Sequence, residues 1–204
     1  PVQTPELANE GASSDAPLER TSSFVPSVVQ LYSAELLAAI GIQGSTDLDR
    51  ACCVGAGGFG YVYRVRSGGL PSVPYQGMCA VKREQHNVLQ PEALENEIEL
   101  LALCHHESLL PLLAYCLDAG CRCLVYPYMP GGSLHDNLIR RERAGLLSRP
   151  LEWQVRLRVL VDVCRALLYL HTPQGRKGTI FHRDIKPDNI LLDELRMSAK
   201  LSDF

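Results

Sequence analysis

The chain contains little of what marks the more specialised protein classes. Aromatic residues make up 6% of its 204 positions, and the net charge is −3 at a sequence pI near 6.1. A nucleic-acid-binding domain would carry a basic patch, which this charge balance does not favour. No apolar run approaches the ~20 residues that a bilayer-spanning helix needs, and no signal peptide is recognisable. With 46% hydrophobic residues, the composition predicts a globular domain with a tail.

Zinc and disulfide patterns are missing as well, although the chain has eight cysteines. No CxxC pair occurs at a zinc-binding spacing. Cys79 and Cys123 lie in segments that read as strands, and Cys164 lies in one that reads as a helix. A disulfide framework would suit a small secreted module in an oxidising compartment. We therefore expect free thiols.

The chain has no Gly-Lys-Ser or Gly-Lys-Thr sequence, which excludes a Walker-type phosphate loop. It has instead a glycine-rich segment whose backbone can approach phosphate oxygens closely. That segment consists of Gly55, Ala56, Gly57, Gly58, Phe59 and Gly60. Residues 61–66 then alternate in period two and are rich in aromatic and β-branched types, which predicts a strand. A glycine turn between two strands is favoured. The alternative is a dinucleotide-binding turn, in which glycines lead from a strand into a helix.

The most informative segment is the charged loop at residues 182–189. Asp184 can accept the proton of an attacking hydroxyl, and Lys186 can neutralise a transferring phosphate. Asn189 follows in the same loop and can hold a magnesium ion. A charged surface turn before a buried strand is the simpler alternative, but it does not explain this order of residues.

This order resembles the catalytic loop of the eukaryotic protein kinase family, and Lys186 resembles the serine/threonine type. Residues 97–101, 105–110, 113–116 and 166–171 are similar to the Pelle, interleukin-1-receptor-associated and plant receptor-like kinases. The resemblance covers residues 24–204. It implies an α+β, protein-kinase-like two-lobed fold, with an antiparallel β-sheet N-lobe carrying one helix and an incomplete helical C-lobe.

In the first lobe the resemblance implies an ion pair between a lysine and a glutamate. Lys82 ends a strand-like segment and would anchor the nucleotide phosphates. A helix is predicted from Pro91 onward. Within it, Glu97 matches the family pattern and is assigned the pair with Lys82, and Glu95 is the alternative. The apolar positions spaced to face the core are Leu94, Ile98 and Leu101.

The resemblance also implies how the chain would bind ATP. Val54 and Val62 would enclose the adenine ring, whose edge would bond to the Pro127 carbonyl and the Met129 amide. Tyr126 would stand behind the ring as the gatekeeper. The implied catalytic residues are Asp184, Lys186, Lys82 and Glu97. The implied cofactor-binding residues are Val54, Gly55, Ala56, Gly57, Gly58, Phe59, Gly60, Val62, Ala80, Lys82, Tyr126, Pro127, Tyr128, Met129, Asn189, Leu191 and Asp203.

Asp203 and Phe204 match the first two residues of the family's Asp-Phe-Gly motif. The resemblance implies that Asp203 and Asn189 hold Mg²⁺. The glycine of that motif, the activation segment and the Ala-Pro-Glu element have no counterpart in these 204 residues. We therefore expect a fragment of a kinase that phosphorylates nothing by itself.

The segment before the charged loop reads as scaffold. Residues 152–171 carry apolar residues at every third or fourth position, which predicts a buried helix. His182 is expected to be structural. Arg183 resembles the arginine of kinases whose activation loop is ordered by phosphorylation.

Three regions are predicted. Residues 1–30 read as a disordered leader, residues 31–129 as the N-lobe with a preceding short helix, and residues 130–204 as a partial C-lobe. The resemblance implies a protein substrate with a Ser or Thr acceptor, a receptor or adaptor upstream, and a cytoplasmic kinase domain. Two other classes stay open: a pseudokinase that binds ATP as a scaffold, and a nucleotide-binding oxidoreductase.

Overall fold

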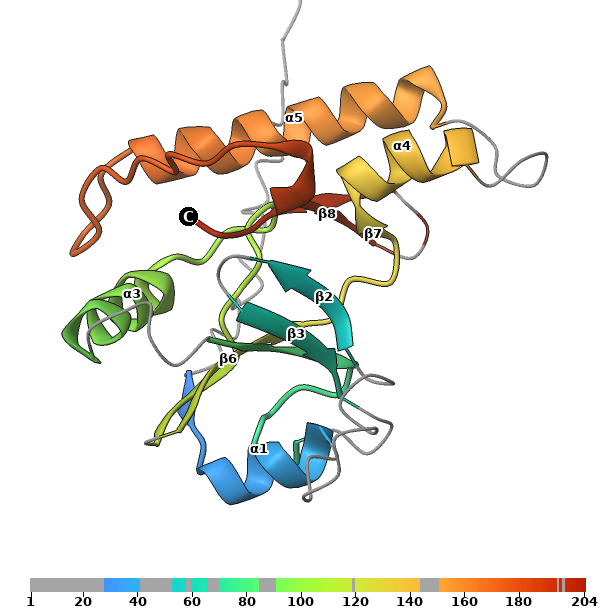
Figure 1. The fold of residues 1–204 in the computed structure, drawn as a ribbon. Helices are drawn as coiled ribbons and strands as arrows, with labels where there is room; N and C mark the ends of the chain where they lie inside the picture. Colours follow the sequence, from blue (N-terminus) through green and yellow to red (C-terminus); the bar gives the residue numbers. More distant parts are fainter. Residues whose placement is uncertain are drawn as a thin grey trace, which may run out of the picture.

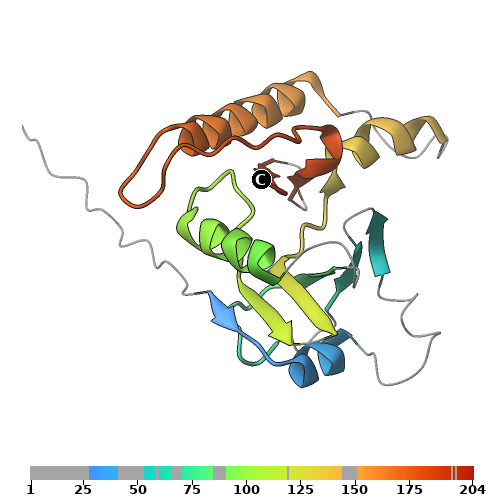
Figure 2. The same ribbon diagram turned by 60° about the vertical axis from the view of Figure 1, so that its left-hand side comes forward.

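The computed structural model describes residues 28–40, 53–57, 60–65, 70–84, 91–118, 120–143, 151–193, 195 and 197–204. Figure 1 shows a sheet with helix α1 (Ser33–Ile40) below it, helix α3 (Pro91–Leu103) to its left, and helices α4 (Leu134–Arg143) and α5 (Trp153–His171) above. The C-terminal end of the chain lies between α3 and α5 in Figures 1 and 2. This two-part α+β arrangement agrees with the predicted two-lobed fold.

The lower part is built on a six-stranded sheet in the order β1-β5-β6-β4-β3-β2. Its strands are β1 (Val29–Gln30), β2 (Cys53–Gly57), β3 (Gly60–Arg64), β4 (Cys79–Arg83), β5 (Ala114–Asp118) and β6 (Cys121–Pro127). All neighbours pair antiparallel except β1, which runs parallel to β5. The predicted antiparallel sheet therefore holds for five strands and not for the edge strand β1.

The two faces of β4 differ in the way that period-two alternation dictates. Cys79 and Val81 are buried in the core that faces α1. Ala80 and Lys82 point to the other face and line a cavity. Strand register therefore decides which residues of this segment can reach a ligand.

The predicted boundary of the leader at residue 30 is wrong. Val29 and Gln30 form β1, whose backbone bonds to the 113–115 segment, and Leu31 is 1% exposed. The Asp118 carboxylate accepts a 2.7 Å bond from the Ser33 amide at the start of α1. Pairing with an existing sheet edge and burial of apolar side chains order this segment despite its weak apolar pattern. The remainder of the predicted leader, residues 1–27, lies outside the described residues.

Helix α3 packs an apolar stripe on the sheet, as its spacing predicts. The buried residues of this stripe are Leu94, Ile98 and Leu101. Glu97 is half-buried, whereas Glu95 and Glu99 are exposed. Glu97 is therefore the one of these three acids that points toward the interior.

The upper part combines α4 and α5 with a small sheet, β7 (Gly132–Ser133), β8 (Ile190–Leu192) and β9 (Ala199–Leu201), in the order β7-β8-β9. Ser133 caps α4, because its hydroxyl accepts a 3.0 Å bond from the Asp136 amide. Helix α5 buries one side, including Val159, Val163 and Leu170, as the periodicity predicts. The charged loop and the 3-10 helix η2 (Pro187–Asn189) run from this helix into β8.

Segment 108–110 joins the two parts. Leu110 donates to the Leu201 carbonyl at 2.9 Å, and Leu201 donates to the Ser108 carbonyl at 2.8 Å. Leu109, between them, is 0% exposed and belongs to the core of the upper part. The chain that leaves α3 is therefore paired with β9 before it enters β5.

All seven cysteines that the structure describes are free thiols. Cys52 lies outside the described residues. Within the described ranges, no group of three or more His, Cys, Asp and Glu side chains is arranged to hold a metal ion. No helix among those residues combines the length and the apolar character that crossing a bilayer requires.

Candidate active site

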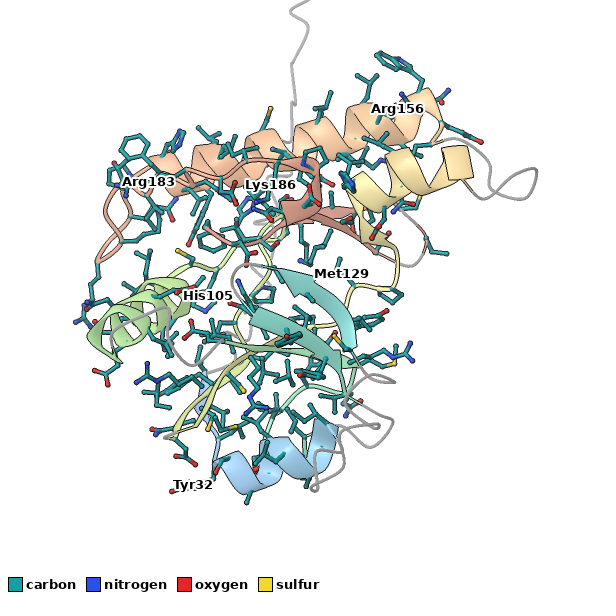
Figure 3. All side chains as sticks on the ribbon, viewed as in Figure 1. Tyr32, His105, Met129, Arg156, Arg183 and Lys186 are labelled. Carbon is teal, nitrogen blue, oxygen red and sulfur yellow. The ribbon has the colours of Figure 1, made fainter. Side chains whose placement is uncertain are left out.

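A cavity of about 580 Å³ lies between the sheet and the upper part. Figure 3 labels Met129 on the connection between the two parts and Lys186 on the upper side. Most of the residues predicted to contact the nucleotide line this cavity. They are Val54, Gly55, Val62, Ala80, Lys82, Tyr126, Pro127, Tyr128, Met129, Leu191 and Asp203.

The glycine-rich segment is a hairpin. Strands β2 and β3 pair antiparallel, with Gly57 opposite Gly60. A dinucleotide-binding turn would lead from a strand into a helix, so this alternative is wrong. Gly60 has a φ of +129°, and a Cβ there would lie 2.0 Å from the Arg83 carbonyl oxygen, so only glycine fits.

The predicted glycine-rich residues divide into three groups. Gly55 lines the cavity, whereas Ala56 and Gly60 lie in the same hairpin without lining it. Gly57 ends β2. Gly58 and Phe59 lie outside the described residues.

The connection after β6 directs backbone groups toward the cavity. Tyr128 donates its amide to the Met78 carbonyl at 2.7 Å, which directs the backbone of that residue toward β4. Alternate residues of an extended strand point their amides and carbonyls to opposite edges. The Pro127 carbonyl and the Met129 amide therefore point away from β4, and both residues line the cavity. Pro127 has no amide hydrogen, and its carbonyl is the group that points away from β4.

Lys82 and Asp203 meet across the cavity. The Lys82 Nζ lies 2.7 Å from Asp203 Oδ1, although the residues are 121 positions apart. Asp203 has a φ of 60°, in the left-handed region that side chains rarely adopt. Asp203 therefore combines an uncommon backbone conformation with a carboxylate that bonds to Lys82.

Two further carboxylates, those of Glu97 and Glu84, interact electrostatically with the Lys82 ammonium. Burial raises the pKa of Glu97, while Lys82 lowers that pKa and Asp203 raises it. Burial and Glu97 also raise the pKa of Glu84, which follows β4. Burial raises the pKa of the Tyr126 hydroxyl well above its ordinary value, with further contributions from Asp203, Glu97 and Glu84. The predicted pair of Lys82 with Glu97 is thus within electrostatic range, next to an acid that the sequence did not indicate.

The charged loop is organised around Asp184. Lys186 Nζ donates to Asp184 Oδ2 at 2.6 Å, and Asn189 Nδ2 donates to the same oxygen at 3.0 Å. These two bonds, first that from Lys186, lower the pKa of Asp184. The bond to Asp184 raises the pKa of Lys186. At neutral pH the loop therefore presents an ionised carboxylate beside a cation.

Buried hydrogen-bonded groups hold the charged loop in place. His182 is 6% exposed, and its Nε2 lies 2.9 Å from the Ser202 carbonyl oxygen. Ser202 donates its amide to the Asn189 carbonyl at 2.9 Å, so the Asn189 backbone is paired with the residue that precedes Asp203. Arg183 has a φ of 66° and an exposed side chain. His182 is structural, as predicted.

The donor set near Asn189 suits a hard cation. Asn189 Nδ2 bonds to the Asp184 carbonyl at 2.8 Å, so the amide oxygen of Asn189 is directed elsewhere. With the Asp203 carboxylate it offers two oxygen ligands of the kind that Mg²⁺ prefers. The residues present therefore fit the ion that the sequence predicts.

Sequence reasoning missed part of the cavity lining, mainly the segment after residues 127–129, the hinge that connects the two parts. The additional lining residues are Leu110, Pro130, Gly131, Gly132, Ser133, Asp136, Asn137, Asp188 and Ser202. The only sequence signal was the Gly131-Gly132 turn after the hinge. A Cβ on Gly131 would lie 2.1 Å from the Asp193 carbonyl oxygen, which identifies a close approach of two backbones.

Comparison with known proteins agrees with this geometry. The protein kinase domain model matches residues 49–204. A probable receptor-like protein kinase of Arabidopsis thaliana is 42% identical over 163 residues, which cover 79% of this chain and 17% of that protein. The receptor protein kinase WSS1 of Oryza sativa subsp. japonica is 33% identical over 186 residues, 90% of this chain and 19% of that protein.

The probable serine/threonine-protein kinase PBL25 of Arabidopsis thaliana is 33% identical over 211 residues, 97% of this chain and 52% of that protein. The chain thus spans between about a sixth and about a half of the length of these relatives. The match covers the glycine hairpin, the hinge and the charged loop together. The chain belongs to the eukaryotic protein kinase family and is of the plant receptor-like type.

Proposed function

We propose that the protein carrying this chain is an ATP-dependent serine/threonine kinase, which transfers the γ-phosphoryl group of Mg-ATP to a Ser or Thr hydroxyl. The observation that carries the proposal is the 2.7 Å contact between Lys82 and Asp203. It places a cation from the sheet beside a carboxylate from the chain end, at one side of a cavity large enough for a nucleotide.

The adenine base would enter the cavity between Val54 and Val62 on the sheet side and Leu191 on the other. Its polar edge would bond to the Pro127 carbonyl and the Met129 amide. Lys82 would hold the α- and β-phosphates, and Glu97 would orient the lysine. These contacts bind and position the nucleotide without covalent chemistry.

Asn189 and Asp203 would hold Mg²⁺, which neutralises charge on the phosphates when it is bound. The Lys82 ammonium already bonds to Asp203, so an unliganded site does not leave this carboxylate without a cation. The chain would contribute the two oxygen ligands, and the bond from the Ser202 amide to the Asn189 carbonyl supports this assignment.

Asp184 would orient the substrate hydroxyl and take its proton. The lowered pKa of Asp184 keeps this carboxylate ionised at neutral pH, as an acceptor must be. Lys186, whose pKa is raised, stays charged and would meet the negative charge that develops on the γ-phosphoryl group.

Nucleotide binding is tested by thermal unfolding of this chain with Mg-ATP, with Mg-ADP and with NAD. We expect Mg-ATP to raise the midpoint and NAD to leave it unchanged. Lys82→Met should abolish most of the ATP-dependent rise. Arg66→Met, a charge removal outside the predicted site, is the matched control. A rise with NAD alone would overturn the nucleotide assignment.

Phosphoryl transfer is tested on the whole protein with Ser-, Thr- and Tyr-containing peptide libraries. We expect transfer to Ser and Thr. Mg-ATP binding without transfer to any acceptor would favour the pseudokinase scaffold. The presence of Lys82, Glu97, Asp184, Asn189 and Asp203 argues for the enzyme, because each has a distinct role in the reaction.

The same proposal extends to the location, the substrate and the upstream partners of the protein. As a kinase of receptor-like type it would act in the cytoplasm on a protein substrate, downstream of a receptor or adaptor. Fractionation of cells that express the tagged whole protein, with protease protection of intact membranes, would test the side on which the kinase part lies.

A further inference from the structure

Lys177 is a buried cation in the loop between α5 and the charged loop. It is 4% exposed, and none of the carboxylates that the structure describes forms an ion pair with it. Its three N–H groups are instead shared among four backbone carbonyls within hydrogen-bond distance of Nζ. These are the carbonyls of Thr172 at 2.7 Å, Tyr169 at 2.9 Å, Leu170 at 3.2 Å and Gly178 at 3.3 Å.

These four carbonyls form a cage around the ammonium, and this carbonyl cage lies at the C-terminal end of α5. The last carbonyls of a helix have no partner within the helix, and their partial negative charge attracts a cation. Thr172 donates both its amide and its hydroxyl to the Leu168 carbonyl. The Lys177 ammonium donates to the next two carbonyls, those of Tyr169 and Leu170. The Tyr169 ring also lies 4.8 Å from the ammonium. These contacts offset the desolvation of the buried charge.

The cage is connected to the charged loop by a short, bonded path. Gln174 and Lys177 exchange two backbone bonds of 2.9 Å each, which fixes the turn. Ile180 then donates its amide to the Leu170 carbonyl at 2.9 Å, so one carbonyl serves both the lysine and the returning chain. His182, anchored on Ser202, follows two residues later, and Asp184 two residues after that.

The cage also touches the end of α3. The Tyr169 hydroxyl accepts a 2.9 Å bond from the His105 amide, and its ring lies 5.1 Å from the His106 ring. The residue that supplies both a carbonyl and a ring to Lys177 therefore contacts the segment that leaves α3. Glu97 lies on the same helix.

We propose that Lys177 is a positioning residue for the charged loop, and that its ammonium in the carbonyl cage fixes the register between the end of α5 and residues 180–184. The consequence for catalysis rests on the proposed kinase function. The structural part does not. Removal of the ammonium leaves the Thr172 and Tyr169 carbonyls without this donor. The bond from the Ile180 amide to the Leu170 carbonyl then has to hold the returning chain without the lysine.

Hydrogen exchange measured by mass spectrometry on Lys177→Met tests the structural part. Methionine keeps an unbranched stem and removes the charge. We expect exchange to accelerate about tenfold or more across residues 178–184 while the β4–β6 sheet keeps its protection. Arg176→Met is the matched control, because it removes an exposed charge from the neighbouring position and should change neither region. Equal acceleration everywhere, or none, would overturn the proposal.

Chemical rescue of Lys177→Ala separates charge from packing. n-Propylammonium replaces the three carbons and the nitrogen that this substitution deletes, and n-propanol is its neutral counterpart. We expect the amine to restore protection of residues 178–184 and the alcohol not to do so. If the variant does not fold, refolding yield in the two solutes is compared with the same expectation. Equal effects of both solutes would mean that the site needs volume and not charge.

The catalytic consequence is measured on the whole protein. Lys177→Met should lower kcat by about tenfold or more through misplacement of Asp184, while KM for ATP stays within about twofold. A wild-type protein that binds no nucleotide would refute the proposed function and leave the exchange result standing. An unchanged kcat beside a locally loosened loop would refute the positioning role alone.

Discussion

The hinge and the charged loop face the same cavity but use different chemistry. At the hinge, the groups that point away from β4 are the carbonyl of Pro127 and the amide of Met129, and both residues line the cavity. Nearly every residue carries such backbone groups. In the charged loop, the working groups are the side chains of Asp184, Lys186 and Asn189, which bond to one another. One region thus depends on backbone course and the other on residue identity.

This difference between backbone and side-chain groups indicates in which region a substitution will affect function. A strand register positions the hinge groups, so a changed side chain leaves them in place as long as the strand persists. In the charged loop each side chain also fixes its neighbour, so one substitution disturbs two functions. Variants in the two regions should therefore separate binding from turnover, and the following measurements examine that separation.

The largest effect is expected for Asp184→Asn in the whole protein. The amide cannot accept the hydroxyl proton, and its oxygen no longer attracts Lys186, so kcat should fall by about 10²–10⁴-fold. The dissociation constant of Mg-ATP, measured by calorimetry, should change little because Asp184 does not line the cavity. Loss of nucleotide binding in this variant would erase the contrast between the two regions.

The next effect concerns Leu109, which lies in the segment that pairs with β9 and joins the lower and upper parts of the molecule. Leu109→Ala removes a fully buried side chain and should lower the free energy of unfolding by about 2–5 kcal/mol. Leu195→Ala, at a position that is 78% exposed, is the control and should be nearly neutral. Denaturant unfolding of both variants measures the difference. Similar stability losses at both positions would argue against this packing.

A smaller effect is expected for Glu84→Gln, and it depends on pH. Burial and Glu97 raise the folded-state pKa of Glu84, against lowering by Lys82 and Arg122. A raised carboxyl pKa contributes stability below the unfolded-state pKa, and this contribution is lost as pH rises through the folded-state pKa. The variant should therefore be the more stable protein at about pH 7, with the gain fading by about pH 4. Thermal unfolding across this range tests the sign, and a gain that grows toward acid would contradict it.

The smallest effect is expected at the hinge. Pro127→Ala keeps the carbonyl that points into the cavity, so the dissociation constant of Mg-ATP should stay within about threefold. Tyr128→Phe serves as the paired variant, since its amide bond to Met78 is also kept. A large loss of affinity in either variant would show that hinge side chains, and not only the backbone, recognise the nucleotide.

Sequence reasoning captured the elements whose signal is local. The hairpin, α3, α5 and the charged loop were each predicted from periodicity and residue type, because these act within a few positions. Gly131 and Asp136 in the cavity wall were missed, since their role comes from how β7 packs on β8. Lys177 gave no signal at all, because a lysine in a loop is normally exposed. The Lys82–Asp203 contact links distant parts of the chain, and only the family resemblance suggested it.

Strand β1 and helix α1 lie at the end of the molecule away from α5, as Figure 2 shows, and they precede the region that the family model matches. Leu36 and Ile40 nevertheless sit at 0% exposure in the sheet core, and β1 covers one edge of β5. A recombinant piece cut at residue 49 would present a bare strand edge and an uncovered apolar surface, a combination that promotes aggregation. Expression boundaries should therefore begin before Val28.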